Sequence, residues 1–315
     1  MESGNSAYEP AGQSTLSSPP TGPSPLFFNE RGLRSGWRLL VYLLIVMCSG
    51  MLIGLIVWSM SVPTRGLPSM YSMLVQEGIG FGLIYGAALI MARMEMRPVG
   101  TYGLPVTEAF GRKFWLGFLF GLGEASALVG LIAAFGGYSF GSLVLHGSEI
   151  VRWGLLHLIL FVFVGFFEEF LFRGYTQHTL ADGIGFWPAA VVLSLIFGRV
   201  HLQNPGENWV GVAGVVLAGL LFAFTLKRTG NLWYAVGMHA SFDWGESFLY
   251  SVPDSGSMLP GHLSNALVTG PSWLSGGSVG PEGSVFCFLT MGLQFLVVMW
   301  LFPKKNAENS PLQTN

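Results

Sequence analysis

Residues 155–174 read LLHLILFVFVGFFEEFLFRG, an apolar run that carries two adjacent glutamates and one arginine near its end. An apolar run of about 20 residues is typical of a helix that crosses a membrane. Burying even one carboxylate in hydrocarbon is costly, so an ionisable residue inside such a helix is a candidate for function. Glu168, Glu169 and Arg173 therefore indicate a site within the membrane.

The composition of the whole chain is also that of a membrane protein. Apolar residues make up 51% of it and charged residues only 10%, and the mean hydropathy is +0.55. We therefore predict an all-α fold, a polytopic bundle of membrane helices. The formal net charge of −2 gives no reason to expect nucleic acid as a partner. Cys48 and Cys287 lie in separate apolar runs and indicate neither a disulfide framework nor a thiolate metal site.

About eight apolar stretches reach the length of a membrane span. They are residues 37–60, 70–92, 113–135, 151–180, 186–202, 209–227, 232–250 and 285–302. Residues 37–302 would thus form the membrane bundle. The Ser-, Pro- and Gly-rich residues 1–36 are predicted to be a disordered cytoplasmic tail, and residues 303–315 a second, short one. The late start of the first apolar run favours an uncleaved helix over a signal peptide.

Basic residues indicate how this bundle is oriented. An even number of spans puts both termini on one side, which would hold eleven of the basic residues. These are Arg31, Arg34, Arg38, Arg93, Arg97, Arg112, Lys113, Lys227, Arg228, Lys304 and Lys305. The other side would hold only Arg65 and Arg152, so the positive-inside rule predicts cytoplasmic termini. Loop 251–284, which has no Lys or Arg, would lie outside. We expect an integral protein of the plasma (inner) membrane, in contact with the lipid bilayer.

Glycines recur at four-residue spacing in two of the predicted spans. Gly78, Gly82 and Gly86 follow this spacing in one span, and Gly117 and Gly121 in the next. Ridges of small residues allow helices to approach closely in lipid. We therefore expect these glycines to lie at helix–helix contacts.

The two glutamates are expected to have different partners. Adjacent residues of a helix project about 100° apart, so Glu168 and Glu169 should not face the same group. Arg173 follows Glu169 by four residues, the spacing at which helical side chains meet. We therefore predict a buried Glu169–Arg173 ion pair, which leaves Glu168 without a local partner and makes it the functional candidate.

Two further polar clusters in predicted spans can meet Glu168. One is His201, in FGRVHLQNP, and the other is His239 with Asp243, in GMHASFDWGE. His239 and Asp243 are four residues apart and share a helical face. The segment YTQHTLA after Gly174 contains no Gly or Pro, so we expect the helix of Glu168 to continue without interruption to about residue 180. A rise of about 1.5 Å per residue then brings the three clusters into one layer of the bundle.

This combination of residues suits the hydrolysis of an amide bond by water. A carboxylate in an apolar cavity can take a proton from water, and two imidazoles can position that water and donate hydrogen bonds to an oxyanion. A nucleophilic-serine GxSxG motif and a zinc-protease HExxH motif are both absent from the sequence. The four residues Glu168, His201, His239 and Asp243 also offer suitable ligands for zinc, so a zinc-dependent reaction stays open.

At these residues the sequence resembles the CPBP, or Abi, family of intramembrane proteases, which includes the type II CAAX prenyl endopeptidases and bacteriocin-immunity proteins. The family motifs are Glu-Glu-x-x-x-Arg, Phe-x-x-x-His and His-x-x-x-Asn or Asp. In this chain they run from Glu168 to Arg173, from Phe197 to His201 and from His239 to Asp243, in the family's order. The resemblance covers a core of about residues 150–250.

The resemblance implies an intramembrane endopeptidase that acts on a membrane-associated protein or peptide. Glu168 would activate water beside His201. Because no ligand pair here has an established zinc spacing, we expect no cofactor, with zinc kept as the alternative. His239 and Asp243 would bind the oxyanion or orient the site. Glu169 and Arg173 would support it.

Two residues depart from what the family pattern leads one to expect. Arg199 introduces a charge within the second motif, and we expect it to restrict access to the site. Asp243 stands where Asn would serve as an oxyanion donor. An ionised Asp only accepts hydrogen bonds, so Asp243 must be protonated, orient His239 or bind a metal.

Other polar residues and other functions remain as alternatives. Glu77 and Glu124 fall within predicted spans but match no motif, and we expect each to make an interhelical hydrogen bond. A zinc-dependent protease with the same four site residues is one alternative function. A non-catalytic immunity or scaffold protein of the membrane is another.

Overall fold

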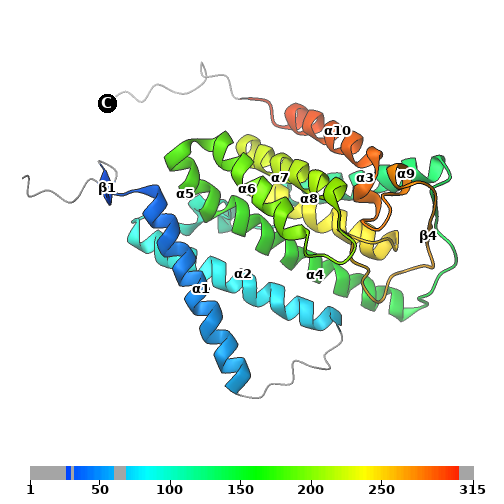
Figure 1. Cartoon of the computed structure of the whole chain (residues 1–315), viewed down its shortest axis with the longest axis horizontal. Helices are drawn as coiled ribbons and strands as arrows, with labels where there is room; N and C mark the ends of the chain where they lie inside the picture. Colours follow the sequence, from blue (N-terminus) through cyan, green and yellow to red (C-terminus); the bar gives the residue numbers. More distant parts are fainter. Residues whose placement is uncertain (1–25, 30–31, 60–68, 305–315) are drawn as a thin grey trace, which may run out of the picture.

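Each of the eight apolar stretches in the sequence coincides with helix in the structure (Figure 1). The structure is a computed structural model that describes residues 26–29, 32–59 and 69–304. Its helices are α1 Ser35–Ser59, α2 Ser69–Met94, α3 Arg112–Ala134, α4 Ser148–Arg173, α5 Tyr175–Ile184, α6 Phe186–His201, α7 Trp209–Thr229, α8 Trp233–Trp244, α9 Ser272–Ser275 and α10 Val285–Leu301. Short turns of 3-10 or π helix are η1 Val99–Tyr102, η2 Val106–Glu108, η3 Gly245–Leu249 and η4 Pro281–Gly283. This arrangement confirms the all-α bundle.

Strands make up very little of the described chain. β1 Phe28–Asn29 pairs with β2 Gly32–Leu33, and β3 Tyr138–Ser139 pairs with β4 Leu267–Val268, both antiparallel. The second pair joins the loop after α3 to the loop before α9. It therefore connects two distant parts of the chain on the side that carries the long loops.

Five helical segments of the described chain are long and apolar enough to cross a membrane. They are Ser35–Ile56, Met70–Met94, Arg112–Ala134, Ser148–Ile184 and Trp209–Thr229. The other three predicted spans are shorter helices, with 16 residues in α6, 12 in α8 and 17 in α10. The chain is thus an integral membrane protein in which full-length and shorter helices form one bundle.

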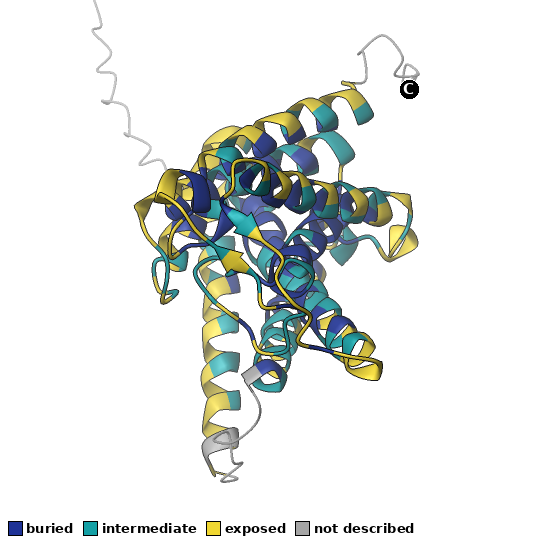
Figure 2. Ribbon diagram, turned by 90° about the vertical axis from the view of Figure 1, so that its right-hand side faces the viewer, coloured by how far each residue is buried: buried dark blue, intermediate teal, exposed yellow. Residues whose placement is uncertain are grey.

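Residues on the outer faces of the bundle are exposed, whereas one central helix is almost completely buried. Figure 2 shows exposed residues on the outward faces of the helices and buried residues gathered inside. The most apolar window of α1 is only 6% buried, as expected for a helix surrounded by lipid. Residues 233–241 of α8 are all buried, so α8 forms the core around which the others pack.

Close contact between α3 and α8 depends on glycine, as the spacing of Gly117 and Gly121 predicted. A Cβ atom on Gly117 would lie 2.0 Å from the carbonyl oxygen of Tyr234, and one on Gly121 would lie 2.1 Å from that of Met238. The expectation for the other ridge holds at Gly78, where a Cβ would lie 3.9 Å from the Phe163 ring of α4, but is wrong at Gly82 and Gly86, where a Cβ would meet nothing within 4 Å. Sequence spacing alone does not show which face of a helix meets a neighbour.

The expected unbroken helix through residues 151–180 is wrong at Gly174. This residue has φ −80° and ψ −122°, which is not helical, and it separates α4 from α5. A Cβ atom at this position would lie 2.4 Å from the carbonyl oxygen of Phe170, so the close turn requires glycine. Helical structure does resume at Tyr175, but as a separate helix.

Polar contacts attach α1 to the bundle at one end. Arg38 forms ion pairs with Glu95 at 3.0 Å and with Asp182 at 2.6 Å. Glu95 follows α2 directly and Asp182 lies on α5, so one guanidinium joins three parts of the fold. The Arg38 side chain is 13% exposed and that of Asp182 37% exposed.

Part of the predicted N-terminal tail has defined structure. The indole Nε1 of Trp37 donates to the carbonyl oxygen of Leu26 at 3.1 Å, and their neighbours form the β1–β2 pair. The predicted boundary at residue 36 is therefore too late, because these contacts fold the chain back before α1. Residues 1–25 and 305–315 of the predicted tails lie outside the described residues.

The start of α1 and the end of α10 lie on the same side of the molecule, opposite β4 and α9 (Figure 1). In a background without Cys48 and Cys287, we expect cysteines replacing Ser6 or Lys304 to be shielded from an impermeant reagent added outside cells. A Ser272→Cys protein should react, because Ser272 is exposed on the loop that the positive-inside rule places outside. Labelling of the first two and not of the third would contradict the orientation.

We expect Gly121→Ala to destabilise the protein by about 1–3 kcal/mol, because the added methyl group meets backbone atoms of α8. The thermal unfolding temperature in detergent would measure this. Gly123→Ala on the same helix is the matched control, since a Cβ there meets nothing within 4 Å. Equal effects of the two substitutions would show that α3 and α8 do not pack as described.

Candidate active site

A cavity of about 260 Å³ lies inside the bundle, between α2, α4 and α8 on one side and α6, α7 and α10 on the other. Its lining includes all four residues expected to be catalytic, which are Glu168, His201, His239 and Asp243. Four further carboxylates line it, those of Glu77, Glu124, Asp254 and Glu282. The three motifs thus contribute to one space.

The imidazole of His239 lies between the two glutamates of α4. Its Nδ1 is 3.0 Å from Oε1 of Glu169, and its Nε2 is 3.6 Å from Oε2 of Glu168. The expectation that these adjacent glutamates should not face one partner is therefore wrong. An imidazole has two nitrogens on different edges of the ring, so one His239 can meet side chains that leave the helix in different directions.

Glu169 and Arg173 form the predicted ion pair. Nη1 of Arg173 donates to Oε1 of Glu169 at 3.1 Å, and both side chains are almost completely buried, at 1% and 0% exposed. The guanidinium also lies 4.4 Å from the ring centre of Phe197, on α6. Oε1 of Glu169 serves both Arg173 and His239, so this carboxylate links the first motif to the third.

The α8 side of the site is fixed by Asp243 and by an aromatic ring. Oδ2 of Asp243 lies 3.4 Å from Nε2 of His239, as the four-residue spacing predicted. The ring of Phe222, on α7, stacks on His239 with centres 5.0 Å apart and an interplanar angle of 12°. Both edges and one face of the imidazole are therefore occupied. No motif or spacing in the sequence indicated Phe222.

His201 enters the cavity from the end of α6. Its Nδ1 lies 2.8 Å from the carbonyl oxygen of Phe197, and the two rings are 4.6 Å apart. A carbonyl oxygen can only accept, so Nδ1 carries the proton and Nε2 of the neutral ring is free to accept one. His201 thus offers a different function from His239, whose two nitrogens both face carboxylates.

Three other expectations have mixed outcomes. Oε1 of Glu124 has no hydrogen-bond partner among the described residues, and Oγ1 of Thr290, on α10, donates to the carbonyl oxygen of Cys287, so the interhelical hydrogen bond of Glu124 stays a prediction. Oε2 of Glu77 has no hydrogen-bond partner among the described residues and lines the cavity instead. Arg199 is exposed and is not part of the described lining, so it does not restrict access. It lies two residues from both Phe197 and His201, on a different face of α6.

Sequence reasoning missed a second acidic group at the loop end of the cavity. Ligand atoms of Glu246, Asp254 and Glu282 all lie within 4.8 Å of one another. Burial, with the neighbouring carboxylates of Asp243 and Glu282, raises the pKa of Asp254 well above its ordinary value. Burial likewise raises the pKa of Glu282. One sequence feature could have indicated this acidic group: the predicted outer loop 251–284 contains Asp254 and Glu282 but no Lys or Arg.

The four residues suggested as zinc ligands do not form an equally compact group. In the described part of the chain, Glu246, Asp254 and Glu282 are the one set of three with ligand atoms this close. His239 reaches Glu168 and Asp243 through Nε2, but His201 is bonded to Phe197. Zinc at the motif residues stays a prediction.

We expect Glu169→Gln to lower the free energy of unfolding by about 3–5 kcal/mol, because Arg173 would remain buried without its counter-charge. The amount of protein in the membrane should fall as a result. Thermal unfolding in detergent and protein level in the membrane would measure this. Glu168→Gln is the control, since the Glu168 side chain is 23% exposed and makes no ion pair with Arg173 in the described chain. Equal losses of abundance would contradict this division of roles.

Comparison with known proteins agrees with the motifs. Residues 150–245 match the family described as type II CAAX prenyl endopeptidase Rce1-like. Searches of curated proteins and of solved structures found no significant match. The matched segment holds all three motifs and most of the cavity wall. Over residues 150–245 this chain is thus similar to the type II CAAX prenyl endopeptidases of the CPBP, or Abi, intramembrane protease family.

Proposed function

We propose that this chain is an intramembrane endopeptidase in which Glu168 activates the attacking water. The observation that carries this proposal is the contrast between the adjacent glutamates. Glu169 is fully buried and bonded to both Arg173 and His239, whereas Glu168 is 23% exposed and lines the cavity. Glu168 is therefore the carboxylate with room for water beside it. Similarity to a family of endopeptidases supports the reaction type.

The reaction needs one proton acceptor and one stabilised oxyanion. The Glu168 carboxylate takes a proton from water as the water oxygen bonds to the scissile carbonyl carbon. The carbonyl oxygen becomes an oxyanion. Glu168 then returns the proton to the leaving nitrogen, and the C–N bond breaks to give a carboxylic acid and an amine, after which the acid loses its proton to water. No covalent intermediate with the protein is required.

His239 is the proposed donor to the oxyanion. Both of its nitrogens face carboxylates, Glu169 on one edge and Glu168 with Asp243 on the other. Carboxylates attract a cation, so this environment favours an imidazolium. Its Nδ1 donates to Glu169 at 3.0 Å, whereas Nε2 lies 3.4 Å from Asp243 and 3.6 Å from Glu168, so its N–H is the one proposed to donate to the oxyanion. A fixed cationic donor in a water-poor cavity stabilises developing negative charge strongly. Stacking on Phe222 keeps the ring in place.

His201 is the proposed second proton carrier. Because Nδ1 donates to the carbonyl oxygen of Phe197, Nε2 is the nitrogen that can exchange a proton. A proton taken from water could thus pass to the leaving amine through His201 as well as through Glu168. Removing His201 should then slow the reaction without stopping it.

The substrate is proposed to be a peptide held at the membrane. Apolar side chains such as Met73, Phe161 and Val164 line the cavity beside the polar residues. The matched family is described as type II CAAX prenyl endopeptidase Rce1-like, so a prenylated CAAX peptide is the first candidate. A prenyl chain and an apolar peptide would both be drawn from the bilayer by the same surface.

The purified protein in lipid vesicles, given a farnesylated CAAX peptide, tests the proposal. We expect cleavage by the wild type and a loss of at least about 100-fold in kcat/KM for Glu168→Gln, the size of a lost general base. Glu149→Gln is the matched control, because Glu149 is exposed at the start of α4. Equal rates for Glu168→Gln and wild type would refute the mechanism.

The same assay separates the alternatives. If water activation by Glu168 suffices, Asp243→Asn should keep most of the activity, and 1,10-phenanthroline should have no effect. A zinc enzyme would lose activity with both. A scaffold protein would not cleave this peptide. Membrane proteomes with and without the active chain would then show no difference in cleaved proteins. Glu168→Gln would leave the cellular effect of a scaffold protein intact.

A further inference from the structure

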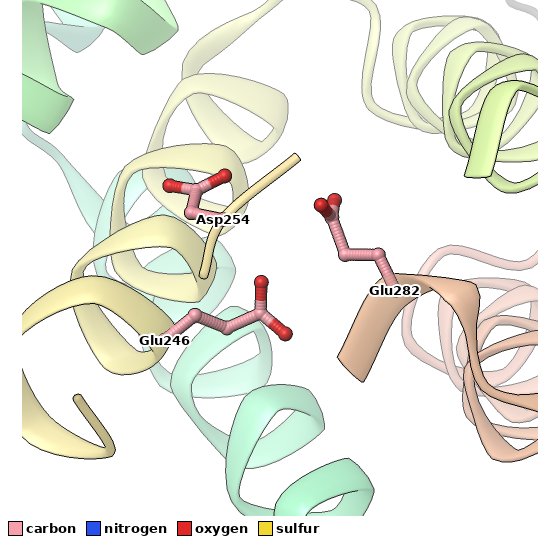
Figure 3. Close-up of side chains that lie close together, drawn as sticks. All are labelled: Glu246, Asp254 and Glu282. Atoms are coloured by element: carbon pink, nitrogen blue, oxygen red, sulfur yellow. The ribbon is translucent and has the colours of Figure 1, made fainter. Parts of the chain in front are cut away.

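Three carboxylates from three chain segments meet at the loop end of the cavity (Figure 3). Glu246 belongs to η3, Asp254 to the loop that follows, and Glu282 to η4. One ligand oxygen from each lies within 4.8 Å of the other two. Like charges this close repel one another strongly in a buried environment, so the group requires neutralisation.

Glu246 lacks any donor for its carboxylate. Its side chain is completely buried, and neither Oε1 nor Oε2 has a hydrogen-bond partner in the described part of the chain. Figure 3 shows this side chain extending toward the space between Asp254 and Glu282. Buried carboxylates are normally paired or bound to a metal. Glu246 therefore points to a missing positive partner in that space.

The other two carboxylates have donors that hold them in position. Oε2 of Glu282 accepts from the backbone N–H of Ser255 at 2.5 Å and from its Oγ at 2.8 Å. Oδ2 of Asp254 accepts from Oγ of Ser247 at 3.2 Å. These donors are neutral, so they orient the oxygens without balancing the charge. Loop 251–284, which supplies Asp254 and Glu282, contains no Lys or Arg.

Backbone hydrogen bonds and close packing connect the segments that carry the three carboxylates. The N–H of Val252 donates to the carbonyl oxygen of Glu246 at 3.0 Å, and that of Gly256 to the carbonyl oxygen of Val279 at 2.8 Å. A Cβ atom on Gly256 would lie 2.6 Å from the carbonyl carbon of Gly206, and one on Gly280 would lie 2.2 Å from the carbonyl oxygen of Pro253. The loops that carry Asp254 and Glu282 therefore interlock at positions where only glycine fits.

We propose that Glu246, Asp254 and Glu282 bind one divalent cation of the calcium type. All three ligands are carboxylate oxygens, which suit hard cations and not zinc or copper. Oxygens within 4.8 Å of one another can all bind one ion. A set of three protein carboxylates is more typical of calcium than of magnesium, which is usually bound by one or two carboxylates and keeps several of its waters. Water and loop carbonyl groups would complete its coordination.

Such an ion would join three segments that build the outer wall of the cavity. Asp254 and Glu282 line the same cavity as Glu168 and His239, so the ion would sit beside the proposed active site without touching its motif residues. Its function would be to hold η3, the following loop and η4 together. This inference does not depend on the chain being a peptidase.

The test uses the full-length protein in detergent, first treated with EGTA and then dialysed free of it. We expect binding of one ⁴⁵Ca²⁺ per chain in equilibrium dialysis and a rise in thermal unfolding temperature as CaCl₂ is added, since a ligand of the native state stabilises it. MgCl₂ at the same concentration should give a smaller rise. Absence of bound calcium, or a larger response to magnesium, would overturn the proposal.

Matched variants assign the binding to this group. Glu246→Gln should lower calcium affinity at least about tenfold, whereas Glu149→Gln and Glu168→Gln should leave it unchanged. If Glu246→Gln does not fold, Asp254→Asn serves the same purpose. Calcium binding of Glu246→Gln or Asp254→Asn equal to that of the wild type would refute the site. Because Glu168→Gln is expected to bind calcium while failing to cleave peptide, failure of one proposal is distinguishable from failure of the other.

Discussion

The structure of the site depends on one buried carboxylate, that of Glu169. It neutralises Arg173 within α4 and at the same time fixes Nδ1 of His239 on α8. A charge placed in hydrocarbon is tolerated only when its partners are held in position. The requirement to satisfy Arg173 therefore also sets the rotation and depth of α8 relative to α4. Once His239 is fixed in this way, its other nitrogen faces Glu168 and Asp243, and the cavity acquires its polar wall.

Local rules predicted much of this arrangement. The Glu169–Arg173 pair and the shared face of His239 and Asp243 follow from four-residue spacing, which holds inside any regular helix. The helical class followed from composition and from the length of the apolar runs. Each of these properties depends on residues that are close in the sequence, so no knowledge of the packing was needed.

What the sequence could not predict depends on contacts between distant segments. The break at Gly174 is set by how closely the turn approaches Phe170, and the single partner of Glu168 and Glu169 is set by where α8 lies. The acidic group of Glu246, Asp254 and Glu282 forms only when two loops interlock. Arg199 was misjudged because a motif fixes spacing and not the face of the helix that meets the cavity.

The attachment of α1 has a consequence for how the surroundings act on the molecule. The core contact of α3 with α8 is made by backbone and apolar atoms, which dissolved ions do not reach. In contrast, α1 combines apolar packing around Tyr42 with the ion pairs of Arg38, and the Asp182 partner is partly open to water. Ionic strength and the charge of lipid headgroups therefore act on the first helix while leaving the centre of the bundle unaffected. The response of the molecule to the surrounding lipid is therefore concentrated at its periphery, away from the central cavity.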